Sequence, residues 1–161
     1  MLKTTGICIV LLLVLASVAL LIVGQLGLLN GQRPADLGIR NGLFTPPDAT
    51  KQNTVSSQAA AYPHTENQRI APIAFTGDGK AAFLKLTLIV GAMDGATVIT
   101  TQPHYLHAEF QSQWLKFVDD AEFSLDEKTS VIHMRSASRL GKSDLGVNRK
   151  RLEAIRTQFN R

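Results

Sequence analysis

Cysteine and metal-binding patterns are almost missing from this sequence of 161 residues. The single cysteine, Cys8, lies in an apolar stretch, so no disulfide can form within the chain. His104, His107 and Glu109 form only a loose cluster, without a second motif at metal-ligand spacing. We therefore expect neither a bound metal nor a cofactor.

Charged residues are lacking from Thr4 to Gln32. The apolar run ICIVLLLVLASVALLIVGQLGLL exceeds the roughly 20 residues that cross a bilayer, so residues 1–30 are expected to form a transmembrane anchor. A cleaved signal peptide is the alternative, because small residues occupy the positions before a possible cleavage site near Ala19. A second apolar run follows that site and favours a retained signal-anchor.

The charges beside this helix give its orientation only weakly. Lys3 precedes it, and the charges that follow are Arg33, Asp36 and Arg40. Short amino-terminal anchors usually translocate the chain that follows them. We therefore expect a single-pass protein of the cell membrane, with its domain on the extracytoplasmic (periplasmic) side. Cleavage near Ala19 would instead give a secreted or periplasmic protein.

The rest of the chain divides by composition. Residues 31–68 are rich in Gly, Pro, Ser, Thr, Asn and Gln and lack periodicity, which is typical of a tether between membrane and domain. A loop of this length is unusual in a compact domain, so we expect parts of it to lie against the domain surface. Residues 69–161 carry the periodic patterns of a globular domain.

Helical and strand patterns alternate within this domain. Phe83, Leu86 and Val90 recur at helical spacing and predict a helix from about 79 to 90. Alternation then predicts one strand through ATVITTQ and YLHAEF, interrupted at Pro103, followed by a hairpin of two further strands. The expected fold class is α+β, with a small antiparallel sheet of about three strands and helices packed on one face.

Pairing apolar side chains across the hairpin predicts its register. Closing it at Glu127 and Lys128 also pairs acidic with basic residues, and gives these partners: Phe123 with Ile132, Ala121 with Met134, Glu122 with His133, Asp120 with Arg135, and Asp119 with Ser136. Asp119 then lies on the apolar face, where a carboxylate must find hydrogen-bond donors.

A final helix is predicted near the carboxyl end. The apolar positions of its buried stripe are Leu145, Leu152, Ile155 and Phe159. Ser143 or Asp144 can cap its start. Asn148 falls within the same stripe, so its amide needs polar partners, most economically from the loop before the helix.

Basic charge is concentrated at the carboxyl end. Residues 135–161 carry eight Lys or Arg and two acidic residues, whereas residues 109–127 carry six acidic residues and one lysine. Neighbouring segments of opposite charge favour pairing inside the domain. A nucleic-acid partner, which needs basic side chains left free on one face, is therefore not expected.

The segment RSASRLGKSDLGVNRKR, residues 135–151, is the main candidate site. Its glycines flank the start of a helix, where free N–H groups and nearby cations favour binding of a phosphate, a carboxylate or an anionic lipid headgroup. A capping Asp144 would occupy those N–H groups and repel an anion. The candidate residues are Arg135, Ser136, Ser138, Arg139, Lys142, Asp144, Asn148 and Arg149, with Asp119 and Asp120 as network carboxylates.

The same residues also fit a purely structural charge network that joins the last helix to the sheet. In this interpretation, which we favour, three carboxylates neutralise three arginines: Asp119, Asp120 and Asp144 with Arg135, Arg139 and Arg149. The cations then left without an evident partner are Lys142, Lys150 and Arg151. Only these cations, and any free part of Arg139, would remain for an anion.

Hydrolysis is the alternative activity. It would need a serine beside a histidine and an aspartate, drawn from Ser56, Ser57 or Ser138, His104, His107 or His133, and Asp119 or Asp120. No nucleophile elbow or other fixed spacing links these residues. We therefore assign no catalytic residue and favour binding over catalysis.

The chain resembles the bacterial and plastid family catalogued as domain of unknown function 1499. The segments that carry the resemblance are YPHTENQRIAPIAF, YLHAEFQSQWLKFVDDAEF, IHMRSASRLGKSDLGVNRKRLEAIR, RPADLGIRNGLF and NTVSSQA. Together they cover nearly everything from Arg33 to Phe159, and the family has no established reaction. Its members commonly carry two cysteines where Asp48 and Thr54 stand here, and such a pair implies an oxidising compartment.

The sequence thus predicts a membrane-anchored extracytoplasmic domain that acts by binding or in the assembly of the cell envelope. Its expected partners are the membrane itself and either an anionic lipid or an envelope protein.

Overall fold

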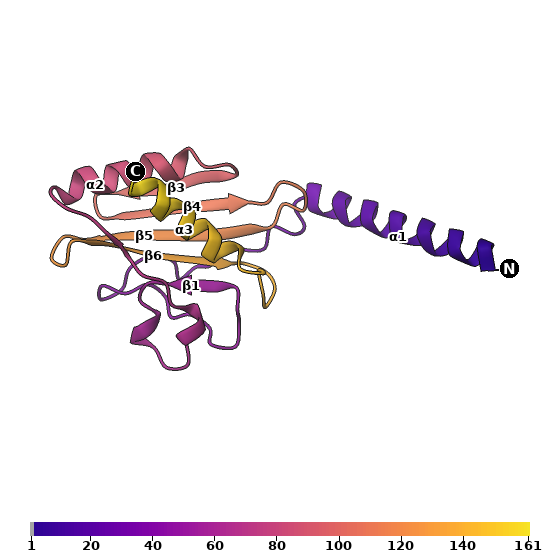
Figure 1. The fold of residues 1–161 in the computed structure, drawn as a ribbon, viewed down its shortest axis with the longest axis horizontal. Coiled ribbons are helices and arrows are strands. Elements are labelled where there is room, and N and C mark those ends of the chain that lie inside the picture. Colours follow the sequence, from indigo (N-terminus) through magenta and orange to yellow (C-terminus); the bar gives the residue numbers. More distant parts are fainter. Residues whose placement is uncertain (1) are drawn as a thin grey trace.

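A six-stranded antiparallel sheet forms the centre of the computed structural model, which describes residues 2–161 (Figure 1). The strands are β1 (Thr54–Ser56), β2 (Ile73–Ala74), β3 (Ala96–Gln102), β4 (Tyr105–Gln111), β5 (Val118–Asp126) and β6 (Val131–Ser138). Their order across the sheet is β1-β6-β5-β4-β3. The short β2 also pairs with β6, so β6 contacts three strands.

Two helices, α2 (Gly79–Gly91) and α3 (Val147–Phe159), cover one face of this sheet (Figure 1). Phe83, Leu86 and Val90 of α2 are buried in the core, as their spacing predicts. The sheet contributes the inward side chains of its central strands, among them Leu106, Ala108, Phe110, Ala121, Phe123, Leu125, Ile132 and Met134. Two single-turn 3₁₀ helices, Ala59–Ala61 and Glu66–Gln68, lie between β1 and β2.

The α+β class is confirmed, but the prediction of about three strands is wrong. Pro103 and His104 do not interrupt one strand; they form the turn of a hairpin in which Gln102 of β3 pairs with Tyr105 of β4. The other two strands, β1 and β2, have three and two residues, which is too short for an alternating pattern to be visible in the sequence.

The register predicted for the β5–β6 hairpin is wrong by two residues. The observed partners are Phe123 with Met134, Ala121 with Ser136, Glu122 with Arg135, Asp120 with Ala137, and Asp119 with Ser138. The connection has four residues, because the Asp126 carboxylate accepts hydrogen bonds from Lys128 N (3.0 Å) and Thr129 Oγ1 (2.7 Å) and so stabilises a wider turn. A shift of two residues keeps every side chain on its expected face and changes only its partner.

The start of α3 also differs from the prediction. Leu145 does not belong to the buried stripe: it precedes the helix and is 88% exposed. Gly146 occupies the N-cap position in left-handed backbone conformation, and the Asp144 carboxylate accepts a hydrogen bond from Asn148 N (2.7 Å). Asp144, two residues before the N-cap, therefore provides the acceptor for a backbone N–H group that the start of the helix would otherwise leave unpaired. Asn148 is fully buried, as predicted.

A separate helix, α1 (Leu2–Gln25), leaves one end of the domain (Figure 1). Within it, Thr4–Gln25 is long and apolar enough to cross a membrane, and its most apolar window is not buried by the rest of the molecule. This length and composition are typical of a membrane anchor and of a signal sequence. Gln25 Nε2 donates to the carbonyl of Trp114 (3.0 Å), which joins α1 to the β4–β5 loop.

Candidate functional site

Buried polar residues lie on both faces of the sheet, near the carboxyl end of β6. On the face covered by α3, Arg151 Nη2 pairs with Asp119 Oδ2 at 2.6 Å. Asn148, one turn earlier in the helix, donates from Nδ2 to Ser138 Oγ (2.9 Å) and Asn53 O (3.1 Å). Its Oδ1 accepts from Arg151 Nη1 and from the Ser136 hydroxyl. This network attaches α3 to β5, β6 and the residue before β1.

The opposite face carries a second network centred on Glu122, whose side chain is fully buried. Glu122 Oε2 accepts from Arg135 Nη1 at 2.6 Å, and Oε1 accepts from the Tyr105 hydroxyl (2.8 Å) and from Gly38 N (2.7 Å). Burial raises the pKa of Tyr105, and the neighbouring Glu122 charge raises it further. The phenol therefore remains a hydrogen-bond donor at any physiological pH.

A chain of charges continues along that face. Asp120 accepts from His107 Nε2 (2.8 Å) and, with both oxygens, from Arg139 (2.8 Å each). Arg139 also pairs with Glu109, which Arg33 contacts at 2.5 Å from outside. Burial alone would raise the pKa of Asp120, but the hydrogen bonds from Arg139 and His107 outweigh it and hold that pKa below its usual value.

Glu109 shows the same balance. Its burial would raise the pKa, whereas hydrogen bonds from Arg139 and Arg33 lower it below the usual value. Arg33 and Gly38 belong to the segment expected to be a tether, and Phe44 of that segment is buried and donates from its N–H to Gln58 Oε1 (2.9 Å). Parts of residues 31–68 therefore lie against the sheet.

The structure divides the predicted residues between the two faces of the sheet, and several predicted partners are different. Arg139 pairs with Asp120. Arg135 pairs with Glu122, and Arg149 donates to the carbonyls of Arg69 (2.7 Å) and Asn67 (2.9 Å) rather than to a carboxylate. Arg151, for which the sequence indicates no partner, is the partner of Asp119.

Sequence reasoning also missed several members of these networks, namely Arg33, Asn53, His107, Glu109 and Glu122. The last three alternate along their strands with the core residues Leu106, Ala108, Phe110, Ala121 and Phe123, so the pattern places them on the other face of the sheet, where polar residues are ordinary. Burial of that face by residues 33–44 makes them structural, and no pattern in the sequence shows where a segment without periodicity will pack.

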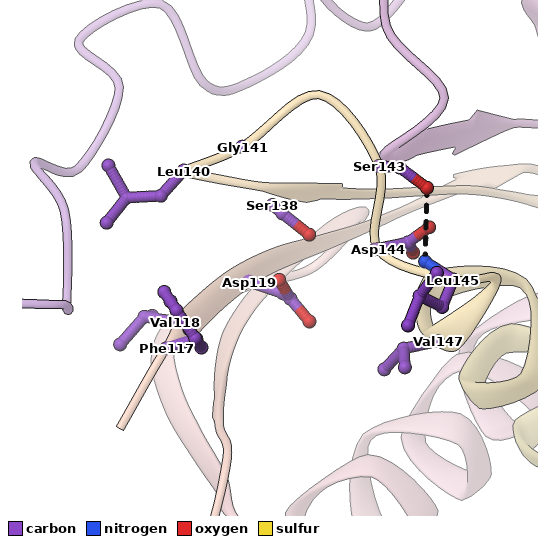
Figure 2. Close-up of a pocket in the computed structure, with 10 residues that line it drawn as sticks. All are labelled: Phe117, Val118, Asp119, Ser138, Leu140, Gly141, Ser143, Asp144, Leu145 and Val147. Atoms are coloured by element: carbon purple, nitrogen blue, oxygen red, sulfur yellow. Dashed lines mark hydrogen bonds between the residues drawn. The ribbon is translucent and has the colours of Figure 1, made fainter. Parts of the chain in front are cut away.

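A pocket of about 310 Å³ opens beside the helix-side network (Figure 2). Its lining residues are Phe117, Val118, Asp119, Ser138, Leu140, Gly141, Ser143, Asp144, Leu145 and Val147. Figure 2 shows Asp119, Ser138 and Asp144 between the apolar side chains of β5 and the β6–α3 loop on one side and those at the start of α3 on the other. The volume is at the lower end of the range for small-molecule sites.

The predicted anion cradle is largely occupied by the protein itself. Gly146 N donates to Asp144 Oδ1 (3.0 Å) and Asn148 N donates to Asp144 Oδ2, so the carboxylate takes the place of an external anion. Lys142 and Lys150 are exposed. The pocket next to this helix start contains carboxylates instead of arginines.

One serine–histidine pair is present. Ser57 Oγ lies 3.2 Å from His133 Nδ1, and Asp126 Oδ2 lies 4.0 Å from the other ring nitrogen. Burial lowers the pKa of His133, partly offset by Asp126, so its ring is neutral near pH 7. Ser56 and Ser138 contact none of the predicted histidines within the described hydrogen bonds. Within residues 2–161, no group of three His, Cys, Asp or Glu side chains could hold a metal ion.

These features define a small α+β domain with two helices on one face of an antiparallel sheet, ion pairs on both faces, and an apolar amino-terminal helix. The chain belongs to the family described as Protein of unknown function (DUF1499), whose profile matches residues 45–159. The resemblance noted in the sequence is thereby confirmed, and the match includes every strand as well as α2 and α3. No curated protein and no solved structure matches the chain.

Proposed function

We propose that this protein is a single-pass, membrane-anchored module that binds a lipid or a component of the cell envelope on the extracytoplasmic side. The observation that carries the proposal is the uncovered apolar surface of α1. Apolar surface of this extent is stable in water only when something covers it. A span of 22 residues, at 1.5 Å per residue, matches a hydrocarbon core about 30 Å thick.

The contact between α1 and the domain supports a retained anchor over a cleaved signal. Gln25 bonds to the backbone of Trp114, and Gly24 approaches Leu115 so closely that an added Cβ would lie 2.7 Å from the Leu115 carbonyl oxygen. The folded domain therefore holds the carboxyl end of the helix. Cleavage near Ala19 would discard most of the helix and leave this contact on a short apolar remnant.

Binding is favoured over catalysis by the state of the charged residues. Asp119, Asp120 and Glu122 each form an ion pair with an arginine, and the arginines are correspondingly engaged. A catalytic acid or base needs a side chain free to exchange a proton with a substrate. The networks instead give a rigid support beside an open pocket.

Fractionation of cells that express the full chain tests the anchor and its orientation. The protein should remain in the membrane pellet after an alkaline carbonate wash, and protease added outside sealed spheroplasts should digest the domain. Release by carbonate would contradict the anchor. A domain that resists external protease, yet is digested after detergent is added, would place it on the cytoplasmic side.

The hydrolase alternative is favoured by one observation, the Ser57–His133 pair. A neutral imidazole beside a serine hydroxyl can act as a general base. Labelling of the purified protein with a fluorophosphonate, which reacts with activated serines, tests this activity directly. The binding proposal expects no labelling above that of the Ser57→Ala and His133→Ala variants, whereas labelling lost in both variants would support a hydrolase.

Anion or headgroup binding by residues 135–151 is a second alternative, and its support is the exposure of Lys142 and Lys150. Basic residues near an anionic membrane each contribute about 1 kcal/mol of binding free energy. Replacing both lysines with glutamine should then weaken binding to vesicles that contain phosphatidylglycerol, and should leave binding to phosphatidylcholine vesicles unchanged.

A further inference from the structure

The pocket is lined by the start of β5 and by the loop between β6 and α3, and these segments lie at the end of the domain from which α1 leaves (Figure 1). Two contacts fix this position. Gln25, the last residue of α1, bonds to Trp114 in the β4–β5 loop, and that loop ends with Phe117, a pocket residue. Gly31 packs so tightly against Arg139 and Leu140 that an added Cβ would lie 3.1 Å from Leu140 Cγ. The pocket is therefore beside the membrane boundary if α1 is the anchor.

The surface around the pocket is suited to the interface between lipid and water. Trp114 is 67% exposed, and Leu145 exposes an even larger fraction of its side chain. The apolar pocket residues that also remain exposed are Phe117, Leu140 and Val147. Tryptophan is enriched at the level of the headgroups because its ring is apolar while its N–H requires a polar partner. This end of the domain thus presents an apolar rim to the bilayer.

The interior of the pocket has a different chemistry. Arg151 engages Asp119 Oδ2, and in the described contacts Oδ1 of the same carboxylate has no hydrogen bond. Ser138 Oγ accepts from Asn148 and can still donate its own proton. Asp144 adds a second carboxylate from the opposite wall (Figure 2). An anion is repelled by such a lining, whereas a hydroxyl or ammonium group finds acceptors.

We propose that this pocket binds an amphiphile from the membrane whose polar end is a hydrogen-bond donor, either a hydroxyl or an ammonium group. The polar end would contact Asp119, Asp144 and Ser138, and the chain would pass over the apolar rim toward the bilayer. This inference rests on the proposed membrane anchor. The proposed ligand is neutral or positively charged at its polar end, whereas the basic sequence of residues 135–151 favours a negatively charged ligand.

Photolabelling of the full chain in lipid nanodiscs tests the pocket. The probes are three single-chain amphiphiles with the same diazirine-bearing chain, ending in an amine, a hydroxyl or a carboxylate, and the labelled residues are identified by mass spectrometry. The amine and hydroxyl probes should label Phe117, Leu140 or Leu145 several-fold more than the carboxylate probe. All three probes should label α1 equally.

The matched variants are Val147→Glu and Leu88→Glu. Val147 lines the pocket at the first position of α3, where a glutamate is compatible with the helix dipole, so the fold should persist. Leu88 is an exposed leucine of α2 away from this pocket. Pocket labelling by the hydroxyl probe, which the added carboxylate does not attract by charge, should drop several-fold in Val147→Glu, because its apolar chain must then pass a charge, and should be unchanged in Leu88→Glu.

The possible failures of this experiment separate the two proposals. Labelling confined to α1, or pocket labelling equal for all three probes, would overturn the pocket proposal and leave the anchor intact. Absence of labelling on α1 would contradict the anchor itself. Equal loss in Val147→Glu and Leu88→Glu would show that the labelling does not report on the pocket, and would also overturn the proposal.

Discussion

Asn148 is the residue at which three distant parts of the chain meet. Its fully buried amide contacts the residue before β1, two serines of β6 and an arginine of its own helix. A buried amide with every group satisfied contributes little net stability, but leaving its partners unsatisfied is costly. The position therefore tolerates no apolar side chain of similar size, even though it lies in an apolar stripe.

Replacing Asn148 with leucine should destabilise the domain by about 2–4 kcal/mol, because the Ser136 hydroxyl loses its acceptor, the Ser138 hydroxyl loses its donor, and Asn53 O keeps only the bond from Ser138 N. Thermal unfolding of the full chain in detergent, followed by near-ultraviolet circular dichroism, measures the effect. Asn160→Leu, at the exposed end of α3, is the control and should change stability by less than about 0.5 kcal/mol. Equal stability of the two variants would contradict the role given to Asn148.

The Asp120 network predicts a loss of stability in acid. The pKa values of Asp120 and Glu109 are lowered in the folded chain, so the unfolded chain binds more protons, and stability rises with pH. Their contribution is fully present above the unfolded values, about 3.9 for Asp and 4.3 for Glu, and is lost as pH falls through the lower folded values. Denaturant unfolding at several pH values below 5 should show a shallower slope for Asp120→Asn than for the natural chain, and identical slopes would refute this assignment.

At the scale of elements, the faces of the strands could be predicted from the sequence, whereas their pairing could not. The alternation in β4, β5 and β6 correctly places Leu106, Phe123 and Met134 in the core. The register was missed because the Asp126 side chain stabilises a four-residue loop, and both loop lengths keep the same faces. Apolar pairing across a hairpin therefore predicts which face each side chain occupies. It does not distinguish two registers that differ by two residues, because both place the side chains on the same faces.

The charge pairs show a related limit. The sequence indicates that the acidic and basic segments neutralise each other, but the partner of Asp119 is decided by where α3 packs. The helix begins at Val147 instead of near Leu145, and in this position Arg151 lies over β5. The guanidinium of Arg151 also lies 4.6 Å from the centre of the Phe110 ring on β4. The partner of a long charged side chain depends on where its helix packs in the fold, and the periodicity of the sequence does not predict that position.

The turn between α2 and β3 gives a prediction for an element boundary. Gly95 has φ of +74°, and an added Cβ would lie 2.5 Å from the carbonyl oxygen of Gln111 on β4. Gly95→Ala should therefore destabilise by more than the about 1–2 kcal/mol expected from left-handed backbone alone. Gly77→Ala, with φ of +80° and open space around the Cβ, carries only that backbone cost and is the control for chemical denaturation. A difference close to zero between the two variants would contradict a close approach at Gly95.

At the scale of the whole molecule, α1 and the elements that line the pocket, the start of β5 and the β6–α3 loop, share one end of the domain, while the β5–β6 turn lies at the other (Figure 1). The carboxyl end of α1 packs so closely against the β4–β5 loop there that almost no space is left between them. If α1 is the proposed anchor, its contact with the β4–β5 loop sets how the domain is oriented against the membrane. The rest of the fold does not depend on this contact, because α1 takes no part in the sheet or its core.

Gly24→Leu should loosen the domain from α1, since any side chain at position 24 meets the Leu115 backbone. Trp114, the single tryptophan of the chain, reports the result. In vesicles with spin-labelled lipid headgroups, quenching of its fluorescence should fall several-fold in Gly24→Leu and remain unchanged in Gly6→Leu, where nothing lies within 4 Å. The unfolding temperature of the domain should be the same in both variants. Unchanged quenching would show that the contact does not seat the domain.

Leu145 lowers the stability of the fold at this end of the domain. Its backbone has φ of +54°, a conformation that costs an ordinary residue about 1–2 kcal/mol, and its side chain, which faces solvent, recovers almost none of that by burial. Glycine would adopt the same turn at lower conformational cost. Folding alone would thus favour glycine here, so the proposed pocket predicts that Leu145→Gly raises the stability of the domain and weakens binding of the amphiphile at the pocket rim.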